Sequence, residues 1–112
     1  MNREKILLFH IIKHCIRIET LLHEKVFEDF NGNDDLRELV CFNELQIGEL
    51  VKKLNSDFRS RYPDVPWKQI AGMRDNIVHG YGNIDYNLIY NSALTGVPEL
   101  KKYCKSIIEK IE

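Results

Sequence analysis

Residues 3–27 read REKILLFHIIKHCIRIETLLHEKVF, and this stretch decides the fold class. Its apolar residues recur at alternating steps of three and four positions, which is the repeat of one face of an amphipathic helix. The positions that set this repeat are Leu8, Ile11, Cys15, Ile18 and Leu22. The stretch therefore predicts a long helix with one apolar face, of the kind found in helical bundles.

A second helix is predicted after a polar turn. Residues 31–34 (Asn-Gly-Asn-Asp) break the pattern, and Asp35 with Glu38 three positions later is typical of a capping box that opens a helix. That helix is expected to reach about Phe58. Its apolar stripe is interrupted by Asn43, which would need hydrogen-bond partners if it is buried.

Prolines and glycines set the bounds of a third helix. Residues 62–66 (YPDVP) cannot continue a helix, because each proline lacks an N–H donor and disfavours helical angles in the residue before it. Pro66 is expected at the first helical position. The helix should end near His79, because Gly80 and Gly82 follow it.

The last part of the chain predicts two more helices. Asp85 is expected to cap a shorter helix that runs to about Leu94. Gly96 and Pro98 are expected to interrupt the chain again. Residues 100–111 are expected to form a final amphipathic helix. The predicted fold is all-α, an antiparallel up-and-down bundle of four main helices with a short one. A length of 112 residues fits a single domain over residues 1–112.

Charge and cysteine content limit the possible classes of protein. A net charge of −1 gives no reason to expect a polyanionic partner, yet residues 52–74 hold six lysines and arginines against two aspartates. This is either a basic zone leading into the segment that follows or a solvated surface with uneven charge. The three cysteines, Cys15, Cys41 and Cys104, are far apart in the sequence, which favours reduced thiols acting as small apolar residues.

Further features argue against a membrane span and a metal site. Charged residues interrupt the first apolar run, so neither a signal peptide nor a membrane span fits, and a cytoplasmic location is expected. His10 and His14 are four residues apart but have no third ligand nearby, so we expect no metal site. No cofactor is expected either.

Residues 74–81 (RDNIVHGY) carry side chains suited to chemistry on a phosphodiester. Arg74 supplies a permanent planar cation that matches phosphate oxygens, and His79 can give and take protons near neutral pH. Asp75 lies four residues before His79, so its carboxylate is expected to orient the imidazole. Tyr81 adds a phenol. On their own, these groups could equally be a surface cation and partly buried side chains without a catalytic role.

Helix geometry separates the arginine from the histidine. Arg74 and His79 differ by about 140° around a helix, so they do not share one face. Either Gly80 ends the helix early and turns His79 round, or a two-fold dimer brings two motifs together. We favour the dimer, because its two histidines could then serve one cleft as base and acid.

The chain resembles the HepT-like toxins of the HEPN superfamily, small helical ribonucleases with the motif Arg, four residues, His, any residue, Tyr. Arg74, His79 and Tyr81 match this motif. The likeness extends over nearly the whole chain and includes residues 3–7 (REKIL), 46–49 (QIGE), 66–73 (PWKQIAGM) and 97–100 (VPEL).

The resemblance implies a homodimeric, metal-independent endoribonuclease whose catalytic residues, Arg74 and His79, line a cleft at the dimer interface. Asp75, Asn76 and Asn43 would support the site, although a purely structural hydrogen bond is an equal alternative for Asn43. RNA carries its own nucleophile in the 2′-OH, so a base such as His79 and a donor such as Arg74 would suffice to release a cyclic phosphate.

The resemblance also implies a partner, an MntA-type nucleotidyltransferase antitoxin. This separate protein would transfer AMP to Tyr81, and the added phosphate and nucleoside would switch the toxin off. The alternative function is a non-catalytic helical binding subunit that pairs with a nucleotidyltransferase. The two functions differ in whether Arg74→Ala and His79→Ala abolish RNA cleavage.

Overall fold

The fold consists of helices joined by short loops. The structure is a computed structural model that describes residues 2–80 and 82–111. Its helices, in chain order, are α1 (Arg3–Leu22), α2 (Phe27–Asn31), α3 (Asp34–Lys53), α4 (Ser56–Ser60), α5 (Trp67–His79), α6 (Tyr86–Asn91), the π-helical segment η1 (Ser92–Gly96) and α7 (Val97–Lys110). The described residues contain no strand, and the predicted all-α class is confirmed. None of the helices among these residues is long and apolar enough to span a membrane.

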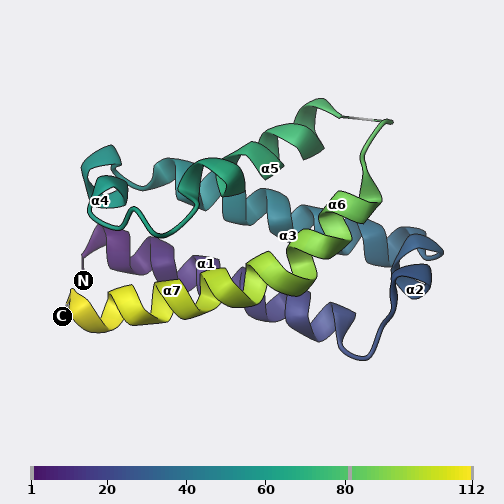
Figure 1. The fold of residues 1–112 in the computed structure, drawn as a ribbon, viewed down its shortest axis with the longest axis horizontal. Helices are drawn as coiled ribbons and strands as arrows, with labels where there is room; N and C mark the ends of the chain where they lie inside the picture. Colours follow the sequence, from purple (N-terminus) through teal and green to yellow (C-terminus); the bar gives the residue numbers. More distant parts are fainter. Residues whose placement is uncertain (1, 81, 112) are drawn as a thin grey trace.

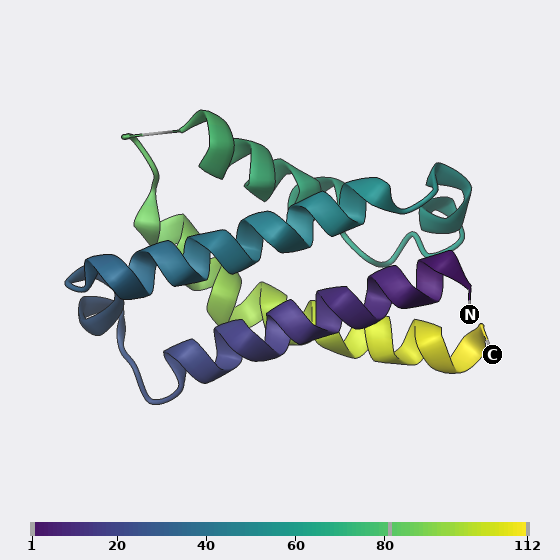
Figure 2. The ribbon, with the colours of Figure 1, turned by 180° about the vertical axis from the view of Figure 1, so that it is seen from behind.

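The main helices alternate in direction, as predicted. α3 packs against both α1 and α5, and α1 packs against α7. At one end of the bundle the Arg3 guanidinium, at the start of α1, donates a 2.8 Å hydrogen bond to the carbonyl of Lys53 at the end of α3. Figures 1 and 2 place α3 between α1 and α5, with both chain ends at the same end of the bundle. The short helices α2 and α4, which were not predicted, lie in the connections before and after α3.

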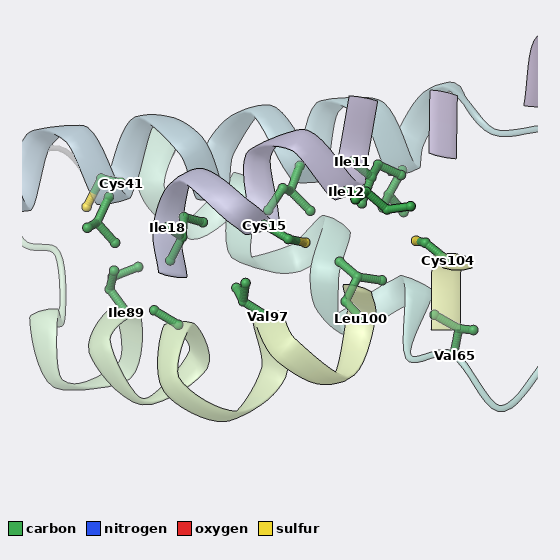
Figure 3. Packing of buried hydrophobic residues seen from close by; sticks show 14 of the residues in the cluster. Ile11, Ile12, Cys15, Ile18, Cys41, Val65, Ile89, Val97, Leu100 and Cys104 are labelled. Carbon is green, nitrogen blue, oxygen red and sulfur yellow. The ribbon is translucent and has the colours of Figure 1, made fainter. Parts of the chain in front are cut away.

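The apolar face predicted for residues 3–27 forms the centre of the core. All five positions that set its repeat are buried. Figure 3 shows this face of α1 turned toward the buried side chains of the C-terminal helix, with Cys15 near Val97 and Leu100. Burial raises the pKa of the Cys15 thiol to about 12, so this residue acts as a small apolar side chain, as predicted.

The first helix ends earlier than predicted. α1 stops at Leu22 rather than near residue 27, and Glu24 adopts a positive φ of 57° in the turn that follows. The Tyr90 hydroxyl donates a 2.8 Å hydrogen bond to the carbonyl of Lys25, which ties this turn to α6. The break allows α2 to place Phe30 in the core.

The bounds of α3 also differ from the prediction. Its N-cap is Asn33, whose side-chain oxygen accepts a 3.0 Å hydrogen bond from the Leu36 N–H, so the expected capping box at Asp35 and Glu38 is wrong. The helix ends at Lys53 rather than near Phe58. Leu54 is extended there and Asn55 caps α4, with its N–H donating to the Glu4 carboxylate at 3.1 Å.

The start of α5 is close to the prediction. Pro66 is the N-cap rather than the first helical residue, and the helix runs from Trp67 to His79. Gly82 has a φ of 82°, a value in the left-handed region that glycine adopts readily.

The predicted interruption at Gly96 and Pro98 is wrong. Asp85 caps α6 as expected, and its carboxylate accepts hydrogen bonds from the N–H groups of Asn87 and Leu88. The chain then stays helical through η1, where the Val97 N–H bonds to the Ser92 carbonyl five residues back. Pro98 lies in the first turn of α7. The wide π-turn accommodates it, because a proline has no N–H to give to an α-helical carbonyl.

Candidate active site

Arg74 is held between α5 and α3 by two carboxylates. Its Nε donates to Glu49 of α3, and its Nη1 donates a 3.0 Å hydrogen bond to Oδ1 of Asp75. The same Asp75 oxygen accepts from Lys52 Nζ at 2.8 Å. Two cations and two anions thus alternate across the contact between α3 and α5.

The hydrogen bonds of this cluster shift the pKa values of Arg74 and Asp75 so that the charged form of each is favoured. The bond to Asp75, followed by the bond to Glu49, raises the pKa of Arg74. The bond from Lys52, followed by the bond from Arg74, lowers the pKa of Asp75. The guanidinium is therefore charged and fixed in direction, and its side chain is 25% exposed. No residue in the described part of the chain bonds its Nη2, so this nitrogen can donate to a phosphate oxygen.

Gly48 lets the two helices approach closely at this point. A side chain there would overlap the Cβ of Arg74. The Arg74 side chain can therefore lie across α3 and reach Glu49.

His79 is the last residue of α5, and its side chain is exposed. The Gly80 N–H closes the helix with a 2.9 Å bond to the Asn76 carbonyl. His79 borders a hollow of about 400 Å³ that Asp75, Asn76 and Leu88 also line. The imidazole is therefore accessible to a large substrate.

The expected pairing of Asp75 with His79 is wrong. Asp75 bonds Lys52 and Arg74 instead, and among residues 2–80 and 82–111 no hydrogen bond or ion pair joins it to His79. The reason is the packing of α5, which places the Asp75 carboxylate within reach of two cations. α5 also stays helical through His79, so Gly80 does not turn this residue toward Arg74. Within one chain the guanidinium and the imidazole thus lie on different sides of the helix.

The remaining predicted site residues have different positions. Asn76 is exposed and lines the hollow beside His79. Asn43 is buried away from α5: its side chain donates to the Leu39 carbonyl and lies 2.8 Å from His14 Nδ1, so it has the structural partners that burial requires. Tyr81, the predicted modification site, lies outside the described residues.

Sequence reasoning assigned neither Glu49 nor Lys52, two residues of the charged cluster, to the site. They are three positions apart on α3, so the sequence places them on one face of that helix. Their pairing with Arg74 and Asp75 depends on how α5 docks on α3, which the sequence pattern alone does not specify. No group of three or more His, Cys, Asp and Glu side chains that could hold a metal ion is present in the part of the chain that the structure describes.

Comparison with known proteins found related chains of similar length. The family model described as "Ribonuclease HepT-like" matches residues 11–107. A protein of Caldanaerobacter subterraneus subsp. tengcongensis with the name "Putative RNase" is 38% identical over 90% of this chain and 90% of its own length. A "Putative RNase" of Methanocaldococcus jannaschii is 35% identical over 96% of this chain and 89% of its own. The "Probable ribonuclease HepT" of Thermococcus cleftensis is 33% identical over 75% of this chain and 76% of its own. No solved structure was found to match.

Proposed function

This chain belongs to the HepT-like ribonuclease family, and from that premise we propose that it is a metal-independent endoribonuclease, the toxin of a type VII-like toxin–antitoxin pair acting on RNA in the cytoplasm. Arg74 and His79 are its catalytic residues in this proposal. The observation that carries it is an oriented, permanently charged Arg74, with one nitrogen that no described residue bonds, five residues before an exposed His79.

The proposed reaction uses the 2′-OH of the RNA as nucleophile. His79 removes the 2′-OH proton, the 2′-oxygen forms a bond to phosphorus, and the bond from phosphorus to the 5′-oxygen breaks. A second histidine, from a partner protomer, protonates the departing 5′-oxygen. Arg74 stabilises the extra charge on the phosphate oxygens in the transition state. The products are a 2′,3′-cyclic phosphate and a 5′-OH end.

A homodimer supplies the second histidine and brings an arginine close to it. Large apolar side chains are exposed on both α1 and α3, and those of Phe9, Ile16, Leu39 and Phe42 are each about half exposed. α5 adds exposed Val78, one turn from Arg74. Exposed apolar side chains on packed helices support a protein interface, and Phe42 and Val78 lie on α3 and α5, the two helices that hold Arg74. An isologous contact here would run up to the guanidinium of each chain.

In the proposed regulation, a separate MntA-like nucleotidyltransferase adds AMP to Tyr81. The attached phosphate anion would compete with RNA for the cation of the site, and the nucleoside would compete for the same space. The expected result of incubation with the cognate transferase and ATP is a mass increase at Tyr81 and a parallel loss of cleavage. A Tyr81→Phe variant should cleave RNA but resist this inactivation.

The decisive test is cleavage of a defined RNA by purified protein in the presence of a chelator. We expect cyclic phosphate ends from the wild type and a loss of about 100-fold or more for Arg74→Ala and His79→Ala. Lys68→Ala, which removes a cation from the same helix, and His23→Ala, which removes an exposed imidazole elsewhere, are the matched controls.

Each alternative outcome has a clear meaning. Cleavage that stops in chelator contradicts the metal-independent mechanism. If wild type, Arg74→Ala and His79→Ala proteins all fold and none cleaves RNA, the non-catalytic binding subunit becomes the better interpretation.

A further inference from the structure

A second and larger hollow lies between α5 and the continuous helix formed by α6, η1 and α7. Its volume is about 690 Å³, which is within the range of small-molecule sites. Glu44 and Ile47 of α3 also line it. Asn76 and Leu88 line both this hollow and the one beside His79. We call it the Glu44 groove. The two hollows are therefore neighbours on one side of α5.

Glu44 is the unusual residue of this groove. Its side chain is buried, with only 4% of the residue exposed. Oε1 accepts a 3.0 Å hydrogen bond from the Ser92 hydroxyl, whereas Oε2 is buried and no described residue bonds it. A buried polar atom without a partner is costly in a folded protein, so this oxygen indicates a missing hydrogen-bond partner.

The charge of the lining restricts what that partner can be. The groove is lined by two carboxyl groups, those of Glu44 and Glu99, and by no described lysine, arginine or histidine. A phosphate would be repelled there. Apolar side chains such as Ile70, Met73 and Leu100 form much of the remaining lining. These features fit a flat, uncharged ring with hydrogen-bonding groups on its edge.

We propose that the Glu44 groove is a nucleobase subsite, in which the Glu44 carboxyl group hydrogen-bonds the edge of an RNA base whose neighbouring phosphate lies at Arg74 and His79. The substrate class rests on the proposed function. The shared lining at Asn76 and Leu88 provides the route from the base to the cleaved phosphate. The described lining of the groove offers no cation to a phosphate, which leaves the phosphate for the guanidinium of Arg74.

The protonation state of Glu44 determines which edges it can bind. Burial raises the pKa of Glu44 to about 8, although the Ser92 hydrogen bond lowers it. Protonated, the group offers one donor and one acceptor, which complement the adjacent donor and acceptor on the edge of any base. Ionised, it offers two acceptors, and among the four bases guanine presents two adjacent N–H donors for them.

Few other titratable groups surround Glu44. The thiols of Cys15 on α1 and Cys41 on α3 interact with it electrostatically, and Glu99 and Tyr103 line the groove from α7. The α5 lining adds amide and apolar side chains but no charged one. The pH response of base binding should therefore be that of Glu44 itself.

The test uses 2′-deoxy dinucleotides of each of the four bases, which bind without being cleaved because they lack the 2′-OH. Amide chemical shifts in a protein NMR titration locate and quantify binding. We expect shifts at groove residues including Asn76 and Ser92, and a roughly tenfold weaker affinity in Glu44→Leu. Glu38→Gln, which changes an exposed carboxylate of α3 outside the groove, is the matched control and should bind as the wild type does.

Glu44→Gln keeps one donor and one acceptor, so it should bind dinucleotides even if Glu44→Leu does not fold. In the wild type the preference for guanine should rise between about one pH unit below and about one unit above the pKa of Glu44. In Glu44→Gln it should not change. Shifts confined to other parts of the surface would mean that the groove holds only water and would overturn the proposal, as would a Glu44→Gln protein with the wild-type pH response.

The two proposals fail separately. Dinucleotide binding in the groove without RNA cleavage would contradict the ribonuclease function and leave the base subsite in place. RNA cleavage whose base preference is the same in the wild type and Glu44→Gln on both sides of the Glu44 pKa would overturn only the subsite.

Discussion

Gly48 of α3 lies directly against Arg74 of α5, and a Cβ at Gly48 would overlap the Cβ of Arg74. The position of the guanidinium thus depends on the neighbouring helix having glycine, which has no side chain, at position 48. Because the contact is between the inner atoms of both residues, a rotation of the arginine tip cannot relieve the overlap.

Gly48→Ala should therefore separate α3 from α5 and displace Arg74. The expected cost is about 1–3 kcal/mol of unfolding free energy, together with reduced RNA cleavage. Gly72→Ala is the matched control, since a Cβ there meets nothing within 4 Å. That variant should be stabilised by about 0.5–1 kcal/mol, because alanine favours a helix more than glycine does. Urea denaturation measures the unfolding free energy of both variants, and equal stability of the two would contradict the prediction.

Asp75 should stabilise the fold only above acidic pH. Its pKa is lowered from the ordinary value of 3.8 by the bonds from Lys52 and Arg74, so its contribution is present above that value and lost as pH falls through the folded pKa. Asp75→Asn should lower Tm at neutral pH, and the difference from the wild type should narrow in acid. Asp64→Asn, at a position without an ion pair in the described residues, should show no such pH-dependent difference.

Glu44 should have the opposite pH dependence. Its pKa is raised from 4.5 to about 8, so the folded state holds a proton that the unfolded chain releases, and stability should fall as pH rises across this range. Above pH 8 Glu44→Gln should be more stable than the wild type by roughly 2–4 kcal/mol. Near pH 4.5 the two should be similar. Denaturation curves that differ by the same amount at both pH values would contradict this.

The proposed dimer predicts that a charge at Phe42 separates the protomers. This side chain is 51% exposed on α3, so Phe42→Glu should leave the monomer folded while weakening association by roughly tenfold or more. RNA cleavage should fall with it, because each cleft loses the second histidine. Light scattering measures the oligomeric state and circular dichroism the helix content. Val26→Glu, at an apolar residue that is 58% exposed outside α1 and α3, should leave the dimer intact.

The sequence predicts the elements that depend on local patterns. The apolar repeat of α1, the cap at Asp85 and the end of α5 at His79 all follow from residues within a few positions, and all three are confirmed. The end of α3 was missed: Leu54 becomes extended there, and Asn55 caps α4 while its N–H bonds Glu4, which is 51 positions away.

The same division holds for the candidate site. The likeness to known ribonucleases identified Arg74 and His79 as a pair to examine, and helix geometry separated them correctly. The partners of Arg74 could not be predicted, because Glu49 and Lys52 meet α5 only through the docking of two helices. The assignment of Asp75 to His79 failed for that reason: a cross-helix cation competed successfully with a neighbour on the same helix.

The π-helical segment Ser92–Gly96 gives one continuous helix two different orientations. A π-turn holds one residue more than an α-turn, so deletion of one residue from the segment would restore the α-helical repeat and rotate α6 by about 100° relative to α7. Tyr90 would then leave its aromatic contacts with Phe27 and Phe30, and Ser92 would turn away from Glu44. The one extra residue of the π-turn thus rotates the buried face of this continuous helix, so that α6 packs against α2 and α7 packs against α1.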